Sequence, residues 1–155
     1  MMALIAELGG QENRLRVPVF DNPKRGAYGG TPLVDGAGQT GKSIDIKGLS
    51  TGITDWIKRG DYFSIVVNGQ PELKICRADA SSDGSGLATL VFEPKLRAVP
   101  ADEAAIYVED GVLTKPEGLF ILTEQTNGWS SRPGHPSKVS TVTLQMIEDV
   151  FISQS

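Results

Sequence analysis

Glycine and proline interrupt this sequence so often that long helices have little room to form. The 155 residues include 18 glycines and 9 prolines, spread along the chain between short runs of apolar and β-branched residues. Glycine destabilises a helix through its backbone entropy, and proline lacks the N–H that the helix needs. About nine short segments remain between turns that recur roughly every 8 to 12 residues, a spacing typical of sandwiches and barrels. The sequence therefore predicts an all-β fold, a β-barrel or β-sandwich meander.

The clearest predicted strands form a hairpin. Tyr62–Val67 is rich in β-branched and aromatic residues and ends at Asn68-Gly69, a dipeptide that favours the two-residue turns of β-hairpins. Glu72–Ala78 then provides the partner strand. Alternation or β-branched content predicts further strands at Arg14–Phe20, near Leu33-Val34, and at Ser43–Ile46, Leu87–Phe92, Ala104–Val108, Leu119–Thr123 and Val139–Ile152.

Two short segments favour helical turns instead. Met2–Leu8 has the composition of two helical turns and ends at Gly9-Gly10, a typical helix C-cap. Ile53–Ile57 is a short apolar stretch that could form one helical turn with Thr54 as its N-cap. Because a protein domain typically has about 150 residues, we expect residues 1–155 to form a single β-rich domain with one short N-terminal helix.

The segment Gly36–Ser43 matches the phosphate-binding P-loop pattern G-x-x-x-x-G-K-[ST] letter for letter. A working P-loop also needs a helix that begins at the lysine and serine, because the first N–H groups of that helix bind the phosphates. Here the residues after Ser43 alternate in polarity and include Gly48 and Gly52, which disfavour a helix. We therefore expect a glycine-rich turn that leads into a strand, rather than a nucleotide site.

Few residues of this chain are suited to catalysis or metal binding. It has one histidine, His135, and one cysteine, Cys76, whereas zinc needs three or four good ligands and a Ser-His-Asp system needs a histidine beside its nucleophile. The net charge of −4 argues against broad nucleic-acid binding, and no apolar run approaches the roughly 20 residues of a membrane helix. We predict no catalytic, cofactor-binding or metal-binding residues, no nucleic-acid or membrane partner, and hence a protein that is not an enzyme.

Four short segments follow one another in an order that resembles a known family. They are Gly36–Gly41 (Gly-Ala-Gly-Gln-Thr-Gly), Gly60-Asp61 before a strand, Leu73–Asp79, and Gly86–Arg97 with its Phe-Glu-Pro-Lys-Leu-Arg end. Over roughly residues 4 to 151, the chain resembles the minor tail, or distal-tail-like, proteins of long-tailed bacteriophages and prophages. Its end is similar too, in Leu119–Leu122 and from Trp129 to Phe151.

The resemblance implies a structural role. It implies a β-rich subunit of the virion, made in the cytoplasm of the bacterial host, whose copies form a ring, commonly a hexamer, at the end of the tail tube. That ring would connect the tube to the host-recognition apparatus, so the implied partners are further copies of this chain and other tail proteins. Family members usually begin some tens of residues earlier, so the resemblance also implies an N-terminally shortened product in which Ala3–Leu8 is the end of a helix.

Tryptophan and arginine are enriched at the energetic centres of protein interfaces. On that ground we expect subunit contacts at Trp56, Arg97, Trp129 and Arg132. Two alternative functions stay open. The first is a carbohydrate- or receptor-binding β-sandwich module that uses Trp129 and Tyr62. The second is a P-loop nucleotide-binding protein, which the match of Gly36–Ser43 to the P-loop pattern suggests.

Overall fold

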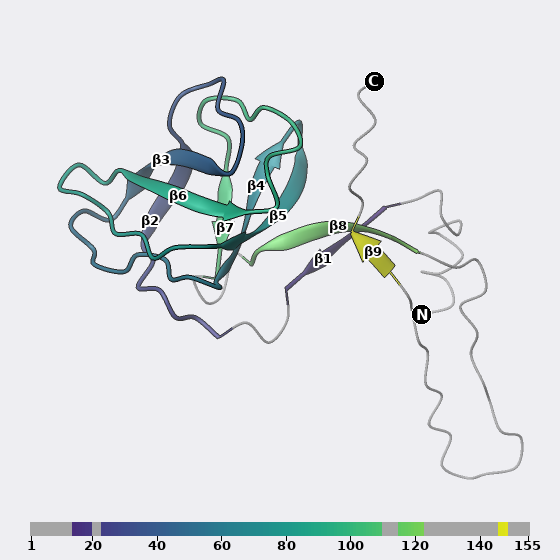
Figure 1. Ribbon diagram of the computed structural model, residues 1–155, viewed down its shortest axis with the longest axis horizontal. Coiled ribbons are helices and arrows are strands. Elements are labelled where there is room, and N and C mark those ends of the chain that lie inside the picture. The colour runs from purple at the N-terminus through teal and green to yellow at the C-terminus, as the bar shows by residue number, and fades with distance from the viewer. Residues whose placement is uncertain (1–13, 20–22, 110–114, 123–145, 149–155) are drawn as a thin grey trace, which may run out of the picture. The chain divides into compact units, whose positions relative to one another are not determined.

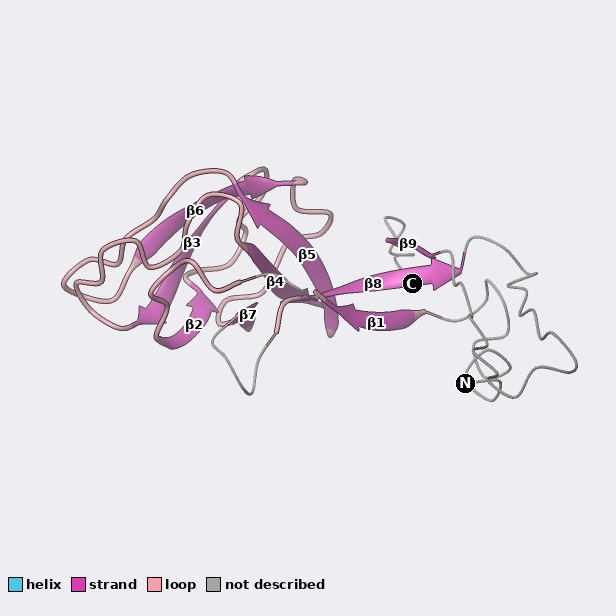
Figure 2. Ribbon diagram, turned by 90° about the horizontal axis from the view of Figure 1, so that it is seen from below, coloured by secondary structure: helices cyan, strands magenta, loops and turns pink. Residues whose placement is uncertain are grey.

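A computed structural model describes residues 14–19, 23–109, 115–122 and 146–148 of the chain (Figure 1). The chain divides into two compact units, one of Arg16–Leu119 and one that takes in Met1–Leu15 and Phe120–Ser155. The predicted helix Met2–Leu8 lies outside the described residues, and the single domain over 1–155 stays a prediction. Every regular element that the structure describes is a strand (Figure 2), so the all-β prediction is confirmed.

The described strands fall into two sheets. One has the order β1-β8-β9, and the other has six strands in the order β2-β3-β6-β5-β4-β7. The strand bounds are β1 Leu15–Pro18, β2 Gly30–Val34, β3 Ser43–Leu49, β4 Tyr62–Val67, β5 Gln70–Cys76, β6 Ala88–Glu93, β7 Ile106–Val108, β8 Glu117–Leu122 and β9 Met146–Glu148.

The six-stranded sheet curls into a nearly closed barrel within the unit Arg16–Leu119 (Figure 1). Its neighbouring strands are antiparallel, and β3 pairs with β6 rather than with β4, so the connection 50–61 crosses one end of the barrel. Val34 closes the barrel, because its N–H donates to Ala104 O at 3.0 Å and its carbonyl accepts from the N–H of Glu103 at 3.0 Å.

Because the strands run antiparallel, their connections gather at two ends of the barrel. We call one the Gln39 end, formed by the loop 35–42, the hairpin turn 68–69 and the segment 94–105. The other is the Asp61 end, formed by the segments 23–29, 50–61 and 77–87.

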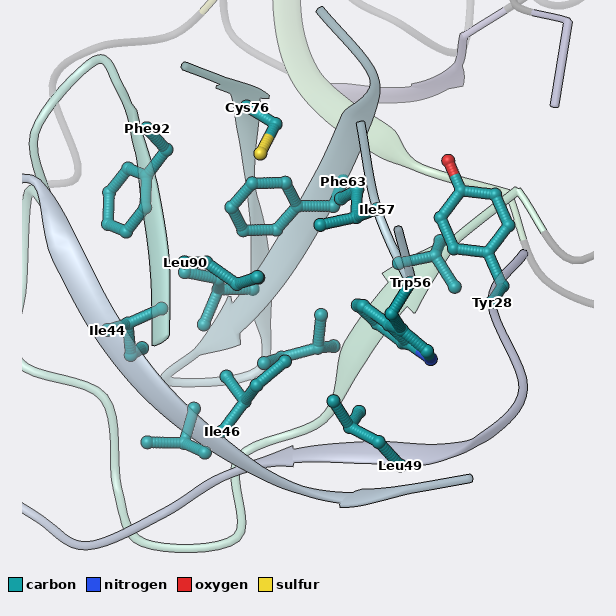
Figure 3. Close-up of a cluster of buried hydrophobic side chains, with 14 of the residues drawn as sticks. Tyr28, Ile44, Ile46, Leu49, Trp56, Ile57, Phe63, Cys76, Leu90 and Phe92 are labelled. Carbon is teal, nitrogen blue, oxygen red and sulfur yellow. The ribbon is translucent and has the colours of Figure 1, made fainter. Parts of the chain in front are cut away.

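The barrel interior is filled by alternate residues of each strand. Phe63 of β4 and Phe92 of β6 meet edge to face with their ring centroids 5.6 Å apart, and both are fully buried. Around them lie the other apolar side chains of the core (Figure 3), among them Val34, Ile44, Ile46, Ile57, Ile65, Val67, Leu90 and Ile106. This in–out alternation is what the strand patterns predict.

The predicted hairpin is confirmed, with its first strand at the predicted bounds and its second, β5, beginning and ending two residues earlier than Glu72–Ala78. β4 and β5 pair from Tyr62↔Ile75 to Val67↔Gln70, which leaves Asn68 and Gly69 as the two turn residues. Both have positive φ, 49° and 75°, as a turn between tightly twisted strands requires. The predicted strand after Ser43 is also confirmed, but it continues as β3 to Leu49.

The helical turn considered for Ile53–Ile57 does not form. Ile57 pairs instead with Ala80 as an antiparallel bridge, and the N–H of Ile53 donates to Ser82 Oγ at 2.9 Å. Asp55 between them has a φ of 52°, which interrupts a right-handed helix. Bonds to the distant segment 80–82 therefore replace the local helical bonds.

Gly48 lies inside β3, where the backbone of β2 passes close to it. Its φ is +79°, and a Cβ added there would lie 2.4 Å from Thr31 O. We expect Gly48→Ala to lower the free energy of unfolding by about 2 to 4 kcal/mol, because alanine adds both backbone strain and a clash. Urea denaturation measures the loss.

Gly52→Ala is the matched control for this change. Gly52 has a similar φ of +66°, but no atom lies within 4 Å of the position of its added Cβ. Only the backbone strain remains, so we expect a loss of about 1 kcal/mol. Equal losses in the two variants would contradict the close approach of β2 to β3 at Gly48.

Candidate functional site

The P-loop-like segment forms the exposed loop 35–42 between β2 and β3. Its glycines Gly36, Gly38 and Gly41 have φ values of 87°, 85° and 89°, a conformation that other residues rarely adopt. The loop leads directly into strand β3 rather than into a helix. A P-loop needs the N-terminus of that helix, so the geometry does not provide a phosphate site of this type.

Gln39 holds this loop in one shape. Its Nε2 donates to Asp35 O at 2.7 Å and to Asp45 O at 3.1 Å, and its Oε1 accepts from the N–H of Asp45 at 2.6 Å. One side chain thus joins the start of the loop to β3. Sequence reasoning did not assign this role, although a lone glutamine among glycines is a signal that could have suggested it.

Lys42, the lysine of the P-loop pattern, forms an ion pair with Glu93. Its Nζ lies 2.6 Å from Glu93 Oε1, and both side chains are exposed in part. The next residue, Ser43, is exposed and pairs with Val91. The ammonium group therefore neutralises a carboxylate of the same chain.

A buried ion pair lies at the Gln39 end of the barrel. Glu72 and Lys74 are both on β5, their side chains have no exposed surface, and Lys74 Nζ lies 2.8 Å from Glu72 Oε2. Lys74 Nζ also donates to Lys95 O at 3.1 Å. Glu72 accepts further bonds from the N–H groups of Arg97 and Ala98, at 3.1 and 3.3 Å. The pair thereby fastens the loop 95–98 to the barrel interior.

At the Asp61 end of the barrel, Asp61 is the buried charge that fastens a loop. It is fully buried and accepts from Arg25 Nε at 2.8 Å, from the Tyr28 hydroxyl at 2.8 Å and from the N–H of Lys58 at 3.0 Å. Burial, and then the hydrogen bond to Asp61, raise the pKa of the Tyr28 hydroxyl far above its usual value, so it stays protonated as the donor. Asp61 thus fastens the segment 23–28 to the barrel.

The two buried carboxylates are placed to hold loops. Glu72 is paired with Lys74, and Asp61 with Arg25, and both accept main-chain N–H groups. Cys76 is buried as well, its thiol donates to Ala78 O at 3.0 Å, and burial raises the pKa of that thiol. A buried, protonated thiol is a poor nucleophile.

The four residues expected at subunit contacts lie in different surroundings or outside the described residues. Trp56 has no exposed surface, because it packs in the core edge to face with Tyr28 and donates from Nε1 to Gly29 O at 2.9 Å (Figure 3). It therefore has no surface left for a neighbouring subunit. Arg97 is half-buried in the loop tied to Glu72. Trp129 and Arg132 lie outside the described residues. The sugar-binding alternative depends on Trp129 and on Tyr62, and Tyr62 is half-buried in β4.

Metal and membrane sites are two further possibilities for the part of the chain that the structure describes. No group of three or more His, Cys, Asp or Glu side chains there is arranged to hold a metal ion. Nor does that part contain a helix with the length and apolar character to cross a bilayer. A scan against protein-family models and a search of curated proteins matched nothing in this sequence. The loops and the residues that fasten them are thus the features from which a function can be argued.

Proposed function

We propose that this protein is a non-enzymatic structural subunit of the tail tip of a long-tailed bacteriophage or prophage. Its copies would form a ring that joins the tail tube to the host-recognition apparatus. The observation that carries this proposal is the glycine-rich turn 36–41, which leads into strand β3 and has its following lysine bound to Glu93. A turn of this kind is what the family resemblance implies at this position, and it favours a structural over a nucleotide-binding role.

Three of the four segments that carry the resemblance have a structural task in the barrel that one residue illustrates. Gln39 shapes the first, and Asp61 in the second fastens the segment 23–28. Gly86 opens the last, where an added Cβ would lie 2.4 Å from Leu49 O, so only glycine fits. These residues serve to hold the fold and its loops, which supports a protein whose task is to present a fixed surface.

A ring requires two different faces on each subunit, since a residue on one flank meets a different residue on the next copy. The loop 94–100 offers one such face. It is held from inside by Glu72 and carries Val99, whose surface is 50% exposed, close in sequence to Arg97. A loop that is already ordered loses less entropy on binding, so a subunit contact there would form at lower cost.

The test is the mass and shape of the purified full chain at high concentration. We expect light scattering to give several times 16.6 kDa, and negative-stain electron microscopy to show rings. A protein that stays at the monomer mass, with no rings on the grids, would contradict the proposal. The gene's neighbours provide a second test, since we expect them to encode a tape-measure protein and other tail-tip components.

Val99→Asp tests the proposed contact loop. We expect this variant to weaken assembly by about tenfold or more, because a charge would replace an apolar side chain at the contact. Its fold should be unchanged, since Val99 is already half in water. Thr54→Asp is the control, at an exposed position of the Asp61 end, and should assemble like the parent. Equal assembly of both variants would remove Val99 from the interface.

A further inference from the structure

The barrel has two junctions where few backbone bonds join neighbouring strands. One is β5–β6, which pairs at Ile75↔Glu93 and Cys76↔Phe92 and continues with one bond from the N–H of Arg77 to Val91 O at 2.8 Å. The other, which we call the seam, lies between β2 and the segment 103–105. In the part of the chain that the structure describes, the seam includes the two bonds of Val34, and Leu33 forms an antiparallel bridge with Ala105.

These two junctions are reinforced in opposite ways. The β5–β6 junction is backed by the buried Glu72–Lys74 pair, which holds the loop after β6 from inside. The seam is backed by groups in water. Buried, hydrogen-bonded charges are costly to separate, whereas exposed ion pairs contribute little and are screened by salt. The seam is therefore the weaker of the two junctions.

The groups that back the seam form what we call the Lys47 cluster, which consists of Lys47, Asp35, Asp102 and Glu103. Lys47 is on β3, and its Nζ reaches Asp102 Oδ1 at 3.0 Å, Glu103 Oε1 at 3.6 Å and Asp35 Oδ1 at 3.7 Å. Since Asp102 and Glu103 precede β7, the ion pairs pass over β2 from one side of the seam to the other. The carboxylate side chains are 42 to 68% exposed.

The central pair of the cluster, Lys47 and Asp102, keeps its charges near neutral pH. The N–H of Gly36, which donates to Asp102 Oδ1 at 2.9 Å, and then the Lys47 ammonium hold the pKa of Asp102 below its usual value. The hydrogen bond to Asp102 raises the pKa of Lys47 in turn. Salt, rather than a change of protonation, is therefore the means of weakening the cluster at neutral pH.

We propose that the seam between β2 and residues 103–105 is the line along which this barrel opens, and that the Lys47 cluster makes a modest, salt-sensitive contribution to its closure. Opening would release the N–H and C=O of Val34 at the edge of β2. This inference stands on the seam's geometry and does not require that the protein belong to a phage tail.

Hydrogen exchange of single amides, followed by NMR on the full chain, tests the proposal. The reporters are the amides of Val34 and Glu103 at the seam, and the reference is the amide of Cys76, which donates to Asp61 O at 2.8 Å. We expect Lys47→Met to speed exchange at both seam amides by roughly fivefold while the Cys76 amide is unchanged, because three carboxylates are left without their cation. Raising salt from about 0.02 M to about 1 M should do the same in the parent protein.

Lys42→Met is the matched control. Lys42 also lies beside β3 and forms an exposed ion pair, with Glu93, but that pair spans the β3–β6 ladder, where four successive residue pairs are in register. We expect its loss to leave the seam amides unchanged. Seam amides that exchange as slowly as the Cys76 amide and respond to neither salt nor Lys47→Met would overturn the proposal. So would an equal acceleration of all amides in Lys47→Met, since the seam would then open only with the whole barrel.

Discussion

Lys74→Met should lower the free energy of unfolding by about 3 to 5 kcal/mol, the loss typical of removing one partner of a buried ion pair. Methionine fills a similar volume but leaves the Glu72 carboxylate buried without its counter-charge, in a site with no exposed surface. It also removes the donor to Lys95 O. Urea denaturation followed by circular dichroism measures the loss.

Lys42→Met is the control, because it removes a lysine from an ion pair in water. The Lys42 and Glu93 side chains are 59% and 38% exposed, so we expect a loss of less than about 1 kcal/mol. If Lys74→Met cost no more than this, the burial of the pair would be refuted.

The double variant Glu72→Leu/Lys74→Met separates charge from hydrogen bonding. It removes both charges, so the penalty of an isolated buried carboxylate disappears. The N–H groups of Arg97 and Ala98 then lose their acceptor, however, and each unsatisfied buried donor costs about 1 to 3 kcal/mol. We therefore expect a stability between those of Lys74→Met and the parent. Full recovery would mean that Glu72 does not hold the loop.

The sequence pattern was sufficient to predict those turns and strands that depend only on residues close together in the sequence. Asn68-Gly69 favours a two-residue turn by itself, so the turn and the first strand of the β4–β5 hairpin could be predicted to the residue, and β5 to within two residues. The strand after Ser43 could be predicted for the same reason, since alternation is a local property. Its continuation through Gly48 could not, because that glycine is explained by Thr31 of the neighbouring strand.

The residues that fasten the loops were missed for a related reason. Alternation along β5 places Glu72 and Lys74 on the same face as buried Cys76, which is an available signal. A charge in that position is ordinarily assigned to the surface, and the N–H groups that satisfy Glu72 come from 25 and 26 residues further along the chain. Trp56 was assigned to an interface because burial in its own core and burial against a partner look alike in sequence.

Asp61→Ala is expected to cost about 3 kcal/mol or more, because one buried carboxylate serves three donors. The Tyr28 hydroxyl and the N–H of Lys58 would each lose an acceptor, at about 1 to 3 kcal/mol per buried group. Arg25 is 44% exposed, so water can replace its bond to Asp61. Urea denaturation gives the total, and Asp79→Ala, which removes one bond to the N–H of Arg59 in an exposed turn, should cost about 1 kcal/mol or less. A loss in Asp61→Ala no larger than this would contradict its role.

The loss of stability at alkaline pH tests the role of Asp61 in a second, independent way. The pKa of Tyr28 is raised in the folded protein above its ordinary value of 10.0, so the stability linked to this phenol is complete below pH 10 and is lost as the pH rises further. Burial is the first cause of the raised pKa, and Asp61 adds to it through its hydrogen bond and its negative charge. In Asp61→Ala the burial remains and the two other causes disappear, so the pKa of Tyr28 should fall towards 10. The decline of stability above pH 10 should then end at a lower pH in the variant than in the parent, and a decline that ends at the same pH in both proteins would show that Asp61 does not act on Tyr28.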